Sequence, residues 1–489
     1  IMTLRERLEE HKLNGETFAA GRETHNNWDG QLTAMQDAVL ADEHFWDTAK
    51  NLIIQGATSS GKTLLAEIAA YRQITDEKIW RKKVIFLFPL RALVTAQCNQ
   101  IKRDFQNVTL NGKHLEIFES SADYQDHDAQ IMMGDYDIAV IVYEKFFALL
   151  SSGQSRENNM LKNCGLVIVD ELQMLSTKDR GPKMEFSIMR LLEMHRVKEE
   201  GDEEPEENIR IIGLTTSESG VEDLGAWMKA NIVGNAIRPV PLRQYIVSYD
   251  TGKMMYKDIA GEGDPAKPDD ANGNPDKVEE ISLLAKFDSG NCDKDKKQRC
   301  LYSLLATWLE PNKEKKILIF TNAKWNTREI ANGIVRKFPQ FEPPAAENAE
   351  RRAELREQFH RVLVEFSDED GVNDLERLIS KGVAFHHSGL PAIVRTMIED
   401  DFRDENGHIQ IVVCTETLMV GMNLPADIVI LYDGTTYRGG KIPVPLSVQS
   451  YNNFVGRAGR LGMNSAPNYR GKSYLLTENL ERDYSRYTA

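Results

Sequence analysis

The chain is poor in the features that mark secreted, disulfide-bonded and membrane proteins. Its 489 residues include five cysteines, an odd number with no C-x-x-C spacing, which argues for reduced thiols in the cytoplasm and against a disulfide framework or a zinc site. They are Cys98, Cys164, Cys292, Cys300 and Cys414. No apolar run approaches the roughly 20 residues of a membrane span, and the charged first residues, IMTLRER, lack the apolar core of a signal peptide. We therefore expect a cytoplasmic protein without a membrane partner.

The net charge of -15 at first argues against a polyanionic partner. Much of the acidity, however, is concentrated in residues 199–207, EEGDEEPEE, a run that predicts a solvated loop facing no ligand. The total charge therefore does not exclude nucleic acid.

One short segment, residues 56–63, has the pattern of a phosphate-binding loop. Its residues are Gly56, Ala57, Thr58, Ser59, Ser60, Gly61, Lys62 and Thr63. An apolar run, residues 52–54, precedes it and a segment with helical spacing, residues 64–71, follows, so the pattern has the strand, loop and helix context that its chemistry requires. In such a loop backbone N–H groups surround phosphate oxygens, Lys62 bridges the outer phosphates and Thr63 binds magnesium. The alternative is a Gly/Ser-rich turn before a helix. The context favours a site for a nucleoside triphosphate such as ATP.

Two carboxylates follow a later apolar run. Residues 166–169 read as a buried strand that ends in Asp170 and Glu171. We expect Asp170 to hold Mg²⁺ through water and Glu171 to orient and deprotonate the attacking water. The alternative is a helix N-terminus, which also favours acidic residues.

Short apolar strands alternate with helical stretches in both halves of the chain. This pattern predicts an α/β fold with parallel sheets covered on both faces. A stretch rich in Gly, Pro, Asp and Lys separates the halves. The predicted organisation is an N-terminal extension (1–30), a first domain (31–248), an acidic and polar linker (249–300), a second domain (301–478) and the start of a following segment (479–489).

The second half ends in Gly456-Arg457-Ala458-Gly459-Arg460, which fits an arginine finger that reaches a γ-phosphate held by another domain. With the phosphate loop and the Asp-Glu pair, this set resembles superfamily 2 helicases. The resemblance narrows to the Ski-type DExH branch, which includes the helicase domain of DNA polymerase theta and archaeal repair helicases. It covers roughly residues 31–478 and includes the segments DELQML (170–175), RG (180–181), RPVPL (238–242), FPLRAL (88–93), YEKF (143–146), HHSGL (386–390), TETL (415–418) and GMNLPA (421–426).

The resemblance implies two tandem RecA-like domains with ATP and Mg²⁺ in a cleft between them. It places Pro89, Arg91, Lys145 and Thr417 along a single-strand track, and Gly421 and Asp427 near the nucleotide. Gln36 precedes the phosphate loop, and its amide both donates and accepts, which suits contact with an adenine edge.

Three positions depart from the family pattern. Gln173 stands where histidine is usual, Asn453 where glutamine is usual, and Thr215-Thr216-Ser217 where Ser-Ala-Thr is usual. These positions couple hydrolysis to domain movement, and our hypothesis is that Gln173 and Asn453 pair across the cleft.

We therefore predict a nucleic-acid-stimulated ATPase that acts as a helicase or translocase, on DNA in preference to RNA and moving 3′ to 5′ by family resemblance. Family members usually continue into a winged helix and a ratchet domain, so we expect this chain to be the motor core. The alternatives are an RNA helicase, or a nucleotide-gated sensor or scaffold that controls an effector such as a nuclease, for example in antiviral defence.

Overall fold

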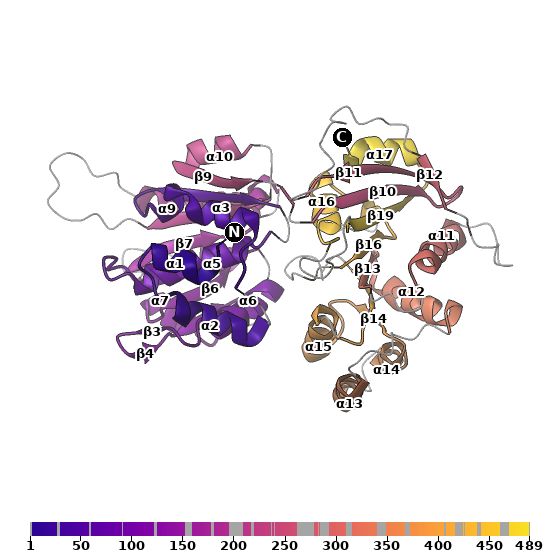
Figure 1. Ribbon diagram of the computed structural model, residues 1–489, viewed down its shortest axis with the longest axis horizontal. Coiled ribbons are helices and arrows are strands. Elements are labelled where there is room, and N and C mark those ends of the chain that lie inside the picture. Colours follow the sequence, from indigo (N-terminus) through magenta and orange to yellow (C-terminus); the bar gives the residue numbers. More distant parts are fainter. Residues whose placement is uncertain are drawn as a thin grey trace. The chain divides into compact units, whose positions relative to one another are not determined.

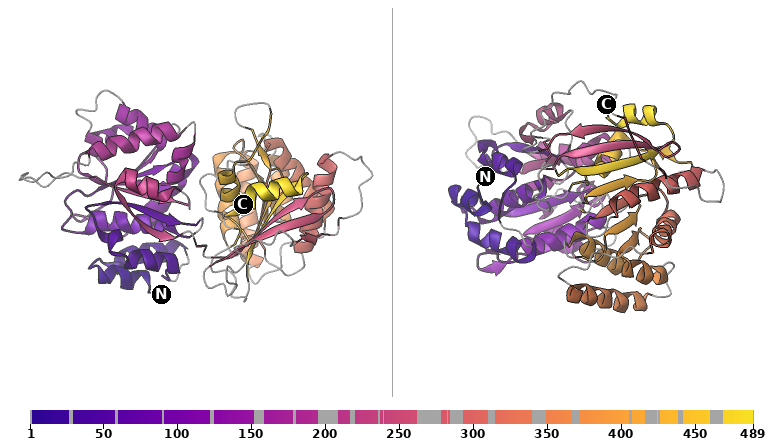
Figure 2. Two further views of the ribbon diagram at one scale, coloured as in Figure 1. Left: turned by 90° about the horizontal axis from the view of Figure 1, so that it is seen from above. Right: turned by 45° about the vertical axis from the view of Figure 1, so that its right-hand side comes forward.

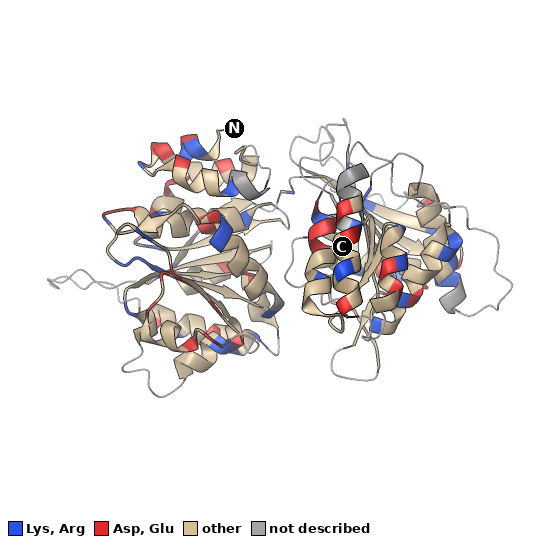
Figure 3. Cartoon of the chain, turned by 90° about the horizontal axis from the view of Figure 1, so that it is seen from below, with Lys and Arg blue, Asp and Glu red and all other residues tan. Residues whose placement is uncertain are grey.

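The computed structural model describes residues 2–488 except 27–29, 58–59, 90, 122–124, 152–158, 178–179, 195–208, 217–219, 236, 239, 262–277, 282, 284–292, 310–314, 340–348, 367–371, 405–406, 416–423, 425, 438–441 and 460–468. The chain divides into two compact units, residues 1–239 and 240–489. Helices in both units carry basic and acidic residues side by side (Figure 3).

The first unit is built on a seven-stranded sheet in which all paired strands are parallel (Figure 1). The strands, in their order across the sheet, are β5 (Ile117–Ser120), β6 (Ile138–Val142), β2 (Lys83–Phe88), β7 (Cys164–Val169), β8 (Arg210–Thr215), β1 (Asn51–Gly56) and β9 (Ala230–Asn235). A separate hairpin joins β3 (Thr109–Leu110) to β4 (Lys113–His114). Because the strands are parallel, their carboxyl ends meet at one edge of the sheet, where ligands of such folds bind.

Helices cover both faces of this sheet. They are α1 (Leu4–Glu10), α2 (Gly15–Asn26), α3 (Ala34–Ala41), α4 (Glu43–Trp46), α5 (Lys62–Thr75), α6 (Arg91–Asp104), α7 (Asp128–Met133), α8 (Tyr143–Ser151), α9 (Gly181–Met194) and α10 (Val221–Met228), with 3-10 helices η1 (Asn159–Leu161) and η2 (Leu172–Ser176). Successive strand residues such as Ile53 and Ile54 enter separate buried clusters, one on each face. The sheet therefore has the two-sided burial that its apolar strands predict.

A buried ionic cluster ties α2 to the helix that follows the phosphate loop. The Arg22 guanidinium donates to the carboxylates of Glu67 on α5 and of Asp104 on α6, the latter at 3.0 Å. Both carboxylates are fully buried and share one guanidinium, so the cluster retains a proton. Burial is the main cause that raises the pKa of Glu67, to about 8; Arg22 opposes the shift and Asp104 adds to it.

The second unit has an eight-stranded sheet. In order its strands are β12 (Val278–Glu280), β11 (Lys253–Ile259), β10 (Leu242–Ser248), β19 (Gly471–Thr477), β16 (Ile428–Leu431), β13 (Ile317–Phe320), β15 (Ile411–Cys414) and β14 (Val383–His386). From β10 to β14 neighbouring strands are parallel, whereas β11 pairs antiparallel with β10, and β12 pairs antiparallel with β11. A small ladder pairs β17 (Thr435–Thr436) with β18 (Val444–Pro445).

The helices of this unit are α11 (Asp293–Trp308), α12 (Lys324–Lys337), α13 (Ala349–Glu365), α14 (Val372–Ser380), α15 (Ala392–Arg403), α16 (Val448–Val455) and α17 (Leu480–Thr488). In Figure 2 the yellow α17 lies along β10 and β11, which it contacts. Tyr487 of α17 stacks on Tyr451 of α16, with ring centroids 4.5 Å apart.

These contacts correct the predicted domain boundaries. The expected first domain ran to residue 248, but β10 pairs along its whole length with β19 and belongs to the second unit. The expected linker, 249–300, contains β11, β12 and the start of α11, and residues 480–488 pack on the second unit. Residues 1–30 are likewise no separate extension, because Leu4, Leu8 and Phe18 enter a core cluster of the first unit. Sequence composition alone did not show these segments' buried residues, which decide where they pack.

Candidate active site

The phosphate loop connects β1 to α5 at the carboxyl edge of the first sheet, and two glycines permit its tight course. Gly61, at the N-cap of α5, has φ +82°, and a Cβ there would lie 2.1 Å from Nε2 of Gln36. A Cβ on Gly56 would lie 2.6 Å from Oγ of Ser60. A Cβ at either position would force the contacting side chains to move, and at Gly61 it would also strain the backbone. Thr58 and Ser59 lie outside the described residues.

Lys62 lies folded into the loop. Its ammonium donates to the carbonyl oxygens of Gly56 at 2.7 Å and Ala57 at 2.9 Å. Burial lowers the pKa of Lys62, and the negative charges of Glu171 and Asp170 act against that shift. The three charged groups therefore lie close enough to influence one another. Thr63 has an exposed side chain in the first turn of α5.

Asp170 and Glu171 follow β7, at the same edge of the sheet. The Asp170 N–H donates to the Leu87 carbonyl oxygen of β2 at 3.0 Å, which extends the sheet pairing by one residue. Burial and, next, the charge of Glu171 raise the pKa of Asp170 to about 7, while Lys62 opposes the shift. Glu171 adopts a left-handed conformation, φ +52°, which is uncommon for a residue other than glycine and turns the chain sharply into η2.

The Gln173 side chain connects this carboxylate pair to the next strand. Its Nε2 donates to a carboxylate oxygen of Glu171 and, at 3.0 Å, to the Thr216 hydroxyl. Its Oε1 accepts from the Thr215 hydroxyl at 3.1 Å and from the Thr216 N–H at 3.3 Å. Two donors and two acceptor positions fill the hydrogen-bonding capacity of an amide.

The hypothesis of an amide pair between Gln173 and Asn453 is therefore not needed to satisfy Gln173, whose side-chain partners among the described residues all belong to the first unit. Asn453 lies half-exposed on α16. Thr216, which the sequence motif contained but did not mark as a site residue, contributes two of the four bonds. Ser217 lies outside the described residues.

Gln36 lies against the phosphate loop. Its Nε2 donates to the Gly61 carbonyl oxygen at 3.1 Å, and its Oε1 accepts from the Thr33 N–H at 2.9 Å in the capping box of α3. One proton of Nε2 and one lone pair of Oε1 remain for another contact. Gln36 thus couples the position of α3 to that of the loop.

Tyr143 is a buried neighbour of the carboxylates that sequence reasoning did not single out, although its motif was quoted. Its hydroxyl has no hydrogen-bond partner among the described residues. Burial and then the charges of Asp170 and Glu171 raise its pKa well above the ordinary value.

The residues expected along a nucleic-acid track are spread over the same edge of the first sheet. Pro89 is buried directly after β2, and Arg91 is exposed at the start of α6. Lys145 on α8 forms an ion pair with Asp128, whose carboxylate also accepts from Ser120 at 2.5 Å. Thr417 lies outside the described residues.

In the second unit, the segments around Asp427 and Arg457 lie side by side. The Ala426 N–H donates to the Arg457 carbonyl oxygen at 3.0 Å, and the Gly459 N–H to the Ala426 carbonyl oxygen at 2.8 Å. The Asp427 carboxylate accepts from the Lys316 N–H at 2.8 Å and the Tyr469 hydroxyl at 2.6 Å. These bonds connect Asp427 to two other segments of the second unit. Arg457 is 8% exposed. Gly421 and Arg460 lie outside the described residues.

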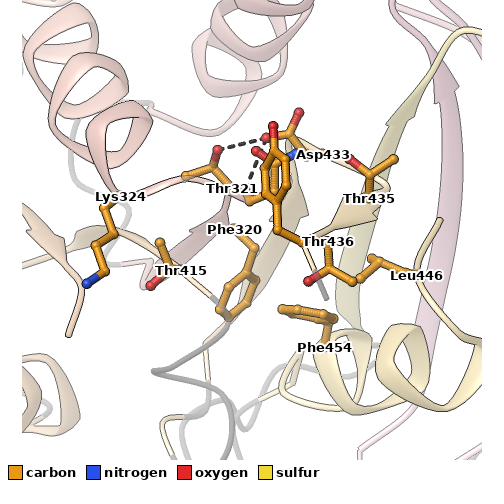
Figure 4. A pocket seen from close by; sticks show the side chains of 11 residues that line it. Phe320, Thr321, Lys324, Thr415, Asp433, Thr435, Thr436, Leu446 and Phe454 are labelled. Atoms are coloured by element: carbon orange, nitrogen blue, oxygen red, sulfur yellow. Dashed lines mark hydrogen bonds between the residues drawn. The ribbon is translucent and has the colours of Figure 1, made fainter. Parts of the chain in front are cut away.

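A pocket of about 190 Å³, lined by both polar and apolar side chains, lies at the carboxyl ends of β13, β15 and β16. Thr321, Lys324, Thr415, Asp433 and Thr435 are among its lining residues (Figure 4). The Asp433 carboxylate accepts from the Thr321 hydroxyl at 2.7 Å and from the Lys297 ammonium at 2.9 Å. The sequence analysis did not predict this pocket, although Thr415 belongs to the quoted segment TETL (415–418). Asp433 comes shortly after an apolar strand, as Asp170 does, so the same sequence pattern could have identified Asp433 as a candidate site residue.

Within the described ranges, no cluster of three or more His, Cys, Asp or Glu side chains is arranged to hold a metal ion. None of the helices in the described part of the chain is long and apolar enough to cross a membrane.

Comparison with known families gives two matches, in the order of the two units. Residues 32–223 match the DEAD/DEAH box helicase family, and residues 347–462 match the helicase conserved C-terminal domain. The two α/β units are consistent with tandem RecA-like domains, and both matches support the resemblance to superfamily 2 helicases.

Individual relatives narrow the resemblance. ATP-dependent DNA helicase Hel308 of Methanocella arvoryzae is 26% identical over 432 residues, which are 88% of this chain and 49% of the relative. Hel308 of Caldivirga maquilingensis is 30% identical over 424 residues, 85% of this chain and 46% of the relative. DNA polymerase theta of Mus musculus is 27% identical over 449 residues, 88% of this chain and 15% of the relative. The chain thus spans about half the length of the Hel308 proteins it matches. The expected resemblance to this helicase branch is confirmed.

Proposed function

We propose that the chain is the ATP- and magnesium-dependent motor of a DNA helicase, which moves along a single strand 3′ to 5′. The observation that carries the proposal is the Gln173 amide. It joins the predicted catalytic base, Glu171, to Thr215 and Thr216 at the end of the neighbouring strand. Through these bonds, a movement of Glu171 during hydrolysis would be transmitted to Thr215 and Thr216 at the same edge of the sheet.

The residues of the loop fit a triphosphate with Mg²⁺. The Ser60 hydroxyl is fully buried and has no hydrogen-bond partner among the described residues, as expected of a group that serves a ligand. Asp170, whose pKa is raised to about 7, would ionise more readily beside a cation. Asp170 and Thr63 would hold the ion, and bound Mg²⁺ would neutralise charge on the phosphates.

Lys62 would exchange its bonds to the Gly56 and Ala57 carbonyl oxygens for bonds to the outer phosphates. Glu171 would accept a proton from the attacking water, and its bond to Gln173 would hold the carboxylate in position. Arg460 would supply the finger in preference to Arg457, because Arg457 is buried in its own unit. Closure of an ATP-filled cleft by the second unit is part of this proposal.

The nucleic acid would lie along the sheet edges that present Pro89, Arg91 and Lys145 in one unit and the Thr321 to Thr415 pocket in the other. Such contacts hold phosphates without reading bases. DNA is proposed over RNA because the Hel308 relatives are DNA helicases by name. The four cysteines of the described part, all buried, support a reducing, cytoplasmic location.

The test is ATP turnover with single-stranded DNA, single-stranded RNA or neither, together with strand displacement on duplexes with 3′ or 5′ overhangs. We expect DNA to stimulate turnover more than RNA, and displacement from 3′ overhangs. Stimulation by RNA alone would indicate an RNA helicase. Stimulated turnover without displacement by the full-length protein would favour a nucleotide-gated sensor.

A further inference from the structure

A second hollow in the second unit is separate from the pocket described above. It is a surface groove of about 420 Å³ between α12 and α14. From α12 it is lined by Trp325, Arg328, Asn332 and Arg336, and from α14 by Asp374 and Arg377. The α12 residues recur at helical spacing, so they form one stripe along that helix. Over eleven residues the stripe is about 16 Å long.

Three arginines and two carboxylates line the groove, so its net charge is +1 although the whole chain carries -15. The Asp374 carboxylate accepts from Arg328 Nε at 2.6 Å and from Asn332 Nδ2 at 3.3 Å. Burial alone would raise the pKa of Asp374, but these bonds and the nearby guanidiniums lower it, so the carboxylate stays ionised and offsets Arg328. Glu329 is the other acidic residue of the lining, against Arg336 and Arg377. Helix α12 as a whole contains Lys324, Arg328, Arg336 and Lys337 and one acidic residue.

An aromatic side chain stands at the start of this basic stripe. Trp325 is 65% exposed, so much of its indole surface is accessible to a ligand. A planar ring beside guanidinium groups is the arrangement on which unpaired bases stack while their phosphates are neutralised.

The groove adjoins the pocket at the carboxyl edge of the sheet. Lys324 lines the pocket and the next residue, Trp325, lines the groove. Lys324 is the first residue of α12, where the helix dipole disfavours a cation and an anion would be stabilised. A strand that passes Thr321 and Lys324 would therefore meet Trp325 next.

We propose that the α12–α14 groove is an extension of the single-strand track, with a base stacked on Trp325 and phosphates on Arg336 and Arg377. At the 3.4 Å spacing of a stacked strand its length corresponds to roughly five nucleotides. This inference rests on the proposed function and lengthens its nucleic-acid site.

The experiment compares Trp325→Ala and Arg336→Glu with matched controls outside the groove. Trp80→Ala replaces another exposed tryptophan, 53% exposed in the first unit, and Arg361→Glu reverses an exposed arginine of α13, 69% exposed. Affinity for labelled oligo-dT of 6 to 30 nucleotides is measured by fluorescence anisotropy over a range of salt concentrations. ATP turnover without DNA and the Tm report whether each variant is folded.

We expect each groove variant to lose about tenfold or more in affinity for long oligonucleotides, and little for the shortest. Arg336→Ala should reduce the slope of log K against log salt by about 0.7, the value for one phosphate contact on a single strand. Both controls should bind as the wild type does, and Trp325→Ala should remove part of the fluorescence quenching caused by DNA.

Unchanged affinity at every length would overturn the inference, and so would an equal loss at all lengths. Polyglutamate tests for an acidic protein partner. If it competes with DNA for the wild type but not for Arg336→Glu, and this variant keeps the full affinity for DNA, the groove would be assigned to an acidic protein instead. If no nucleic acid stimulates the wild-type ATPase, the proposed function itself fails. If nucleic acid stimulates the wild type and the groove variants bind and respond in the same way, only the inference about the groove fails.

Discussion

Replacing Gln173 by alanine tests the link between the hydrolysis site and the rest of the sheet edge. The change removes the bond to the Glu171 carboxylate and the bonds to Thr215 and Thr216. A hydrogen bond to a charged group contributes about 1.5–3 kcal/mol. If Glu171 needs this bond in the transition state, kcat for ATP should fall about 10- to 150-fold, since each 1.36 kcal/mol is a factor of ten. The KM for ATP should change little, because the described hydrogen bonds of the Gln173 side chain go to Glu171, Thr215 and Thr216.

The measurement is steady-state ATP turnover with saturating single-stranded DNA, and strand displacement under the same conditions. Ser176→Ala is the matched control, because Ser176 lies on the same 3-10 helix and its hydroxyl bonds only to the Gln173 carbonyl oxygen, at 2.9 Å. Gln173→His, which restores the residue usual in the family, should recover part of the activity. Turnover and displacement by Gln173→Ala within twofold of the wild type would refute the reasoning.

Three further predictions follow from the same region. Lys62→Ala and Glu171→Gln should each abolish ATP turnover, but only Lys62→Ala should also weaken equilibrium binding of a fluorescent ATP analogue; normal turnover in either would contradict the assignment. Gly61→Ala should lower the Tm and ATP affinity, because φ is +82° and the new Cβ meets Gln36 Nε2 at 2.1 Å; adding Gln36→Ala should relieve the clash but not the backbone strain. Glu67 keeps its proton in the folded state up to about pH 8, whereas the unfolded chain loses it near the ordinary pKa of 4.5. The folded state therefore loses stability as pH rises through that window, and Glu67→Gln should lack this loss. The difference in unfolding free energy between Glu67→Gln and the wild type, measured by chemical denaturation, should then grow by up to about 1.36 kcal/mol per pH unit. A difference that stays constant with pH would show that Glu67 is ionised throughout.

Several features of the fold were accessible from the sequence because they depend on neighbours in the chain. The glycines at positions 56 and 61 and the apolar residues before them predict a strand, a loop and a helix, and β1 indeed ends at Gly56 and α5 begins at Lys62. The apolar run 166–169 likewise ends β7 at the residue before Asp170. Backbone conformation and strand burial are expressed in residue types close together in sequence.

The boundary between the units was not accessible in this way. Residues 242–248 were assigned to the first domain because they precede the polar stretch, yet they pair with β19, more than two hundred residues later. Composition records how polar a segment is, whereas strand pairing depends on which distant segment offers a complementary edge and a shared buried face.

By itself the sequence determined that the chain has a phosphate loop, an Asp-Glu pair and two α/β halves, since each is written in consecutive residues. Only the tertiary structure decided what these parts touch. It placed β8 beside β7, which brings Thr215 and Thr216 to Gln173 and occupies the amide within the first unit. It also set α14 against α12, so that scattered arginines line one groove. Contacts of this kind arise from burying surfaces of residues far apart in the chain, and no local pattern encodes which surfaces meet.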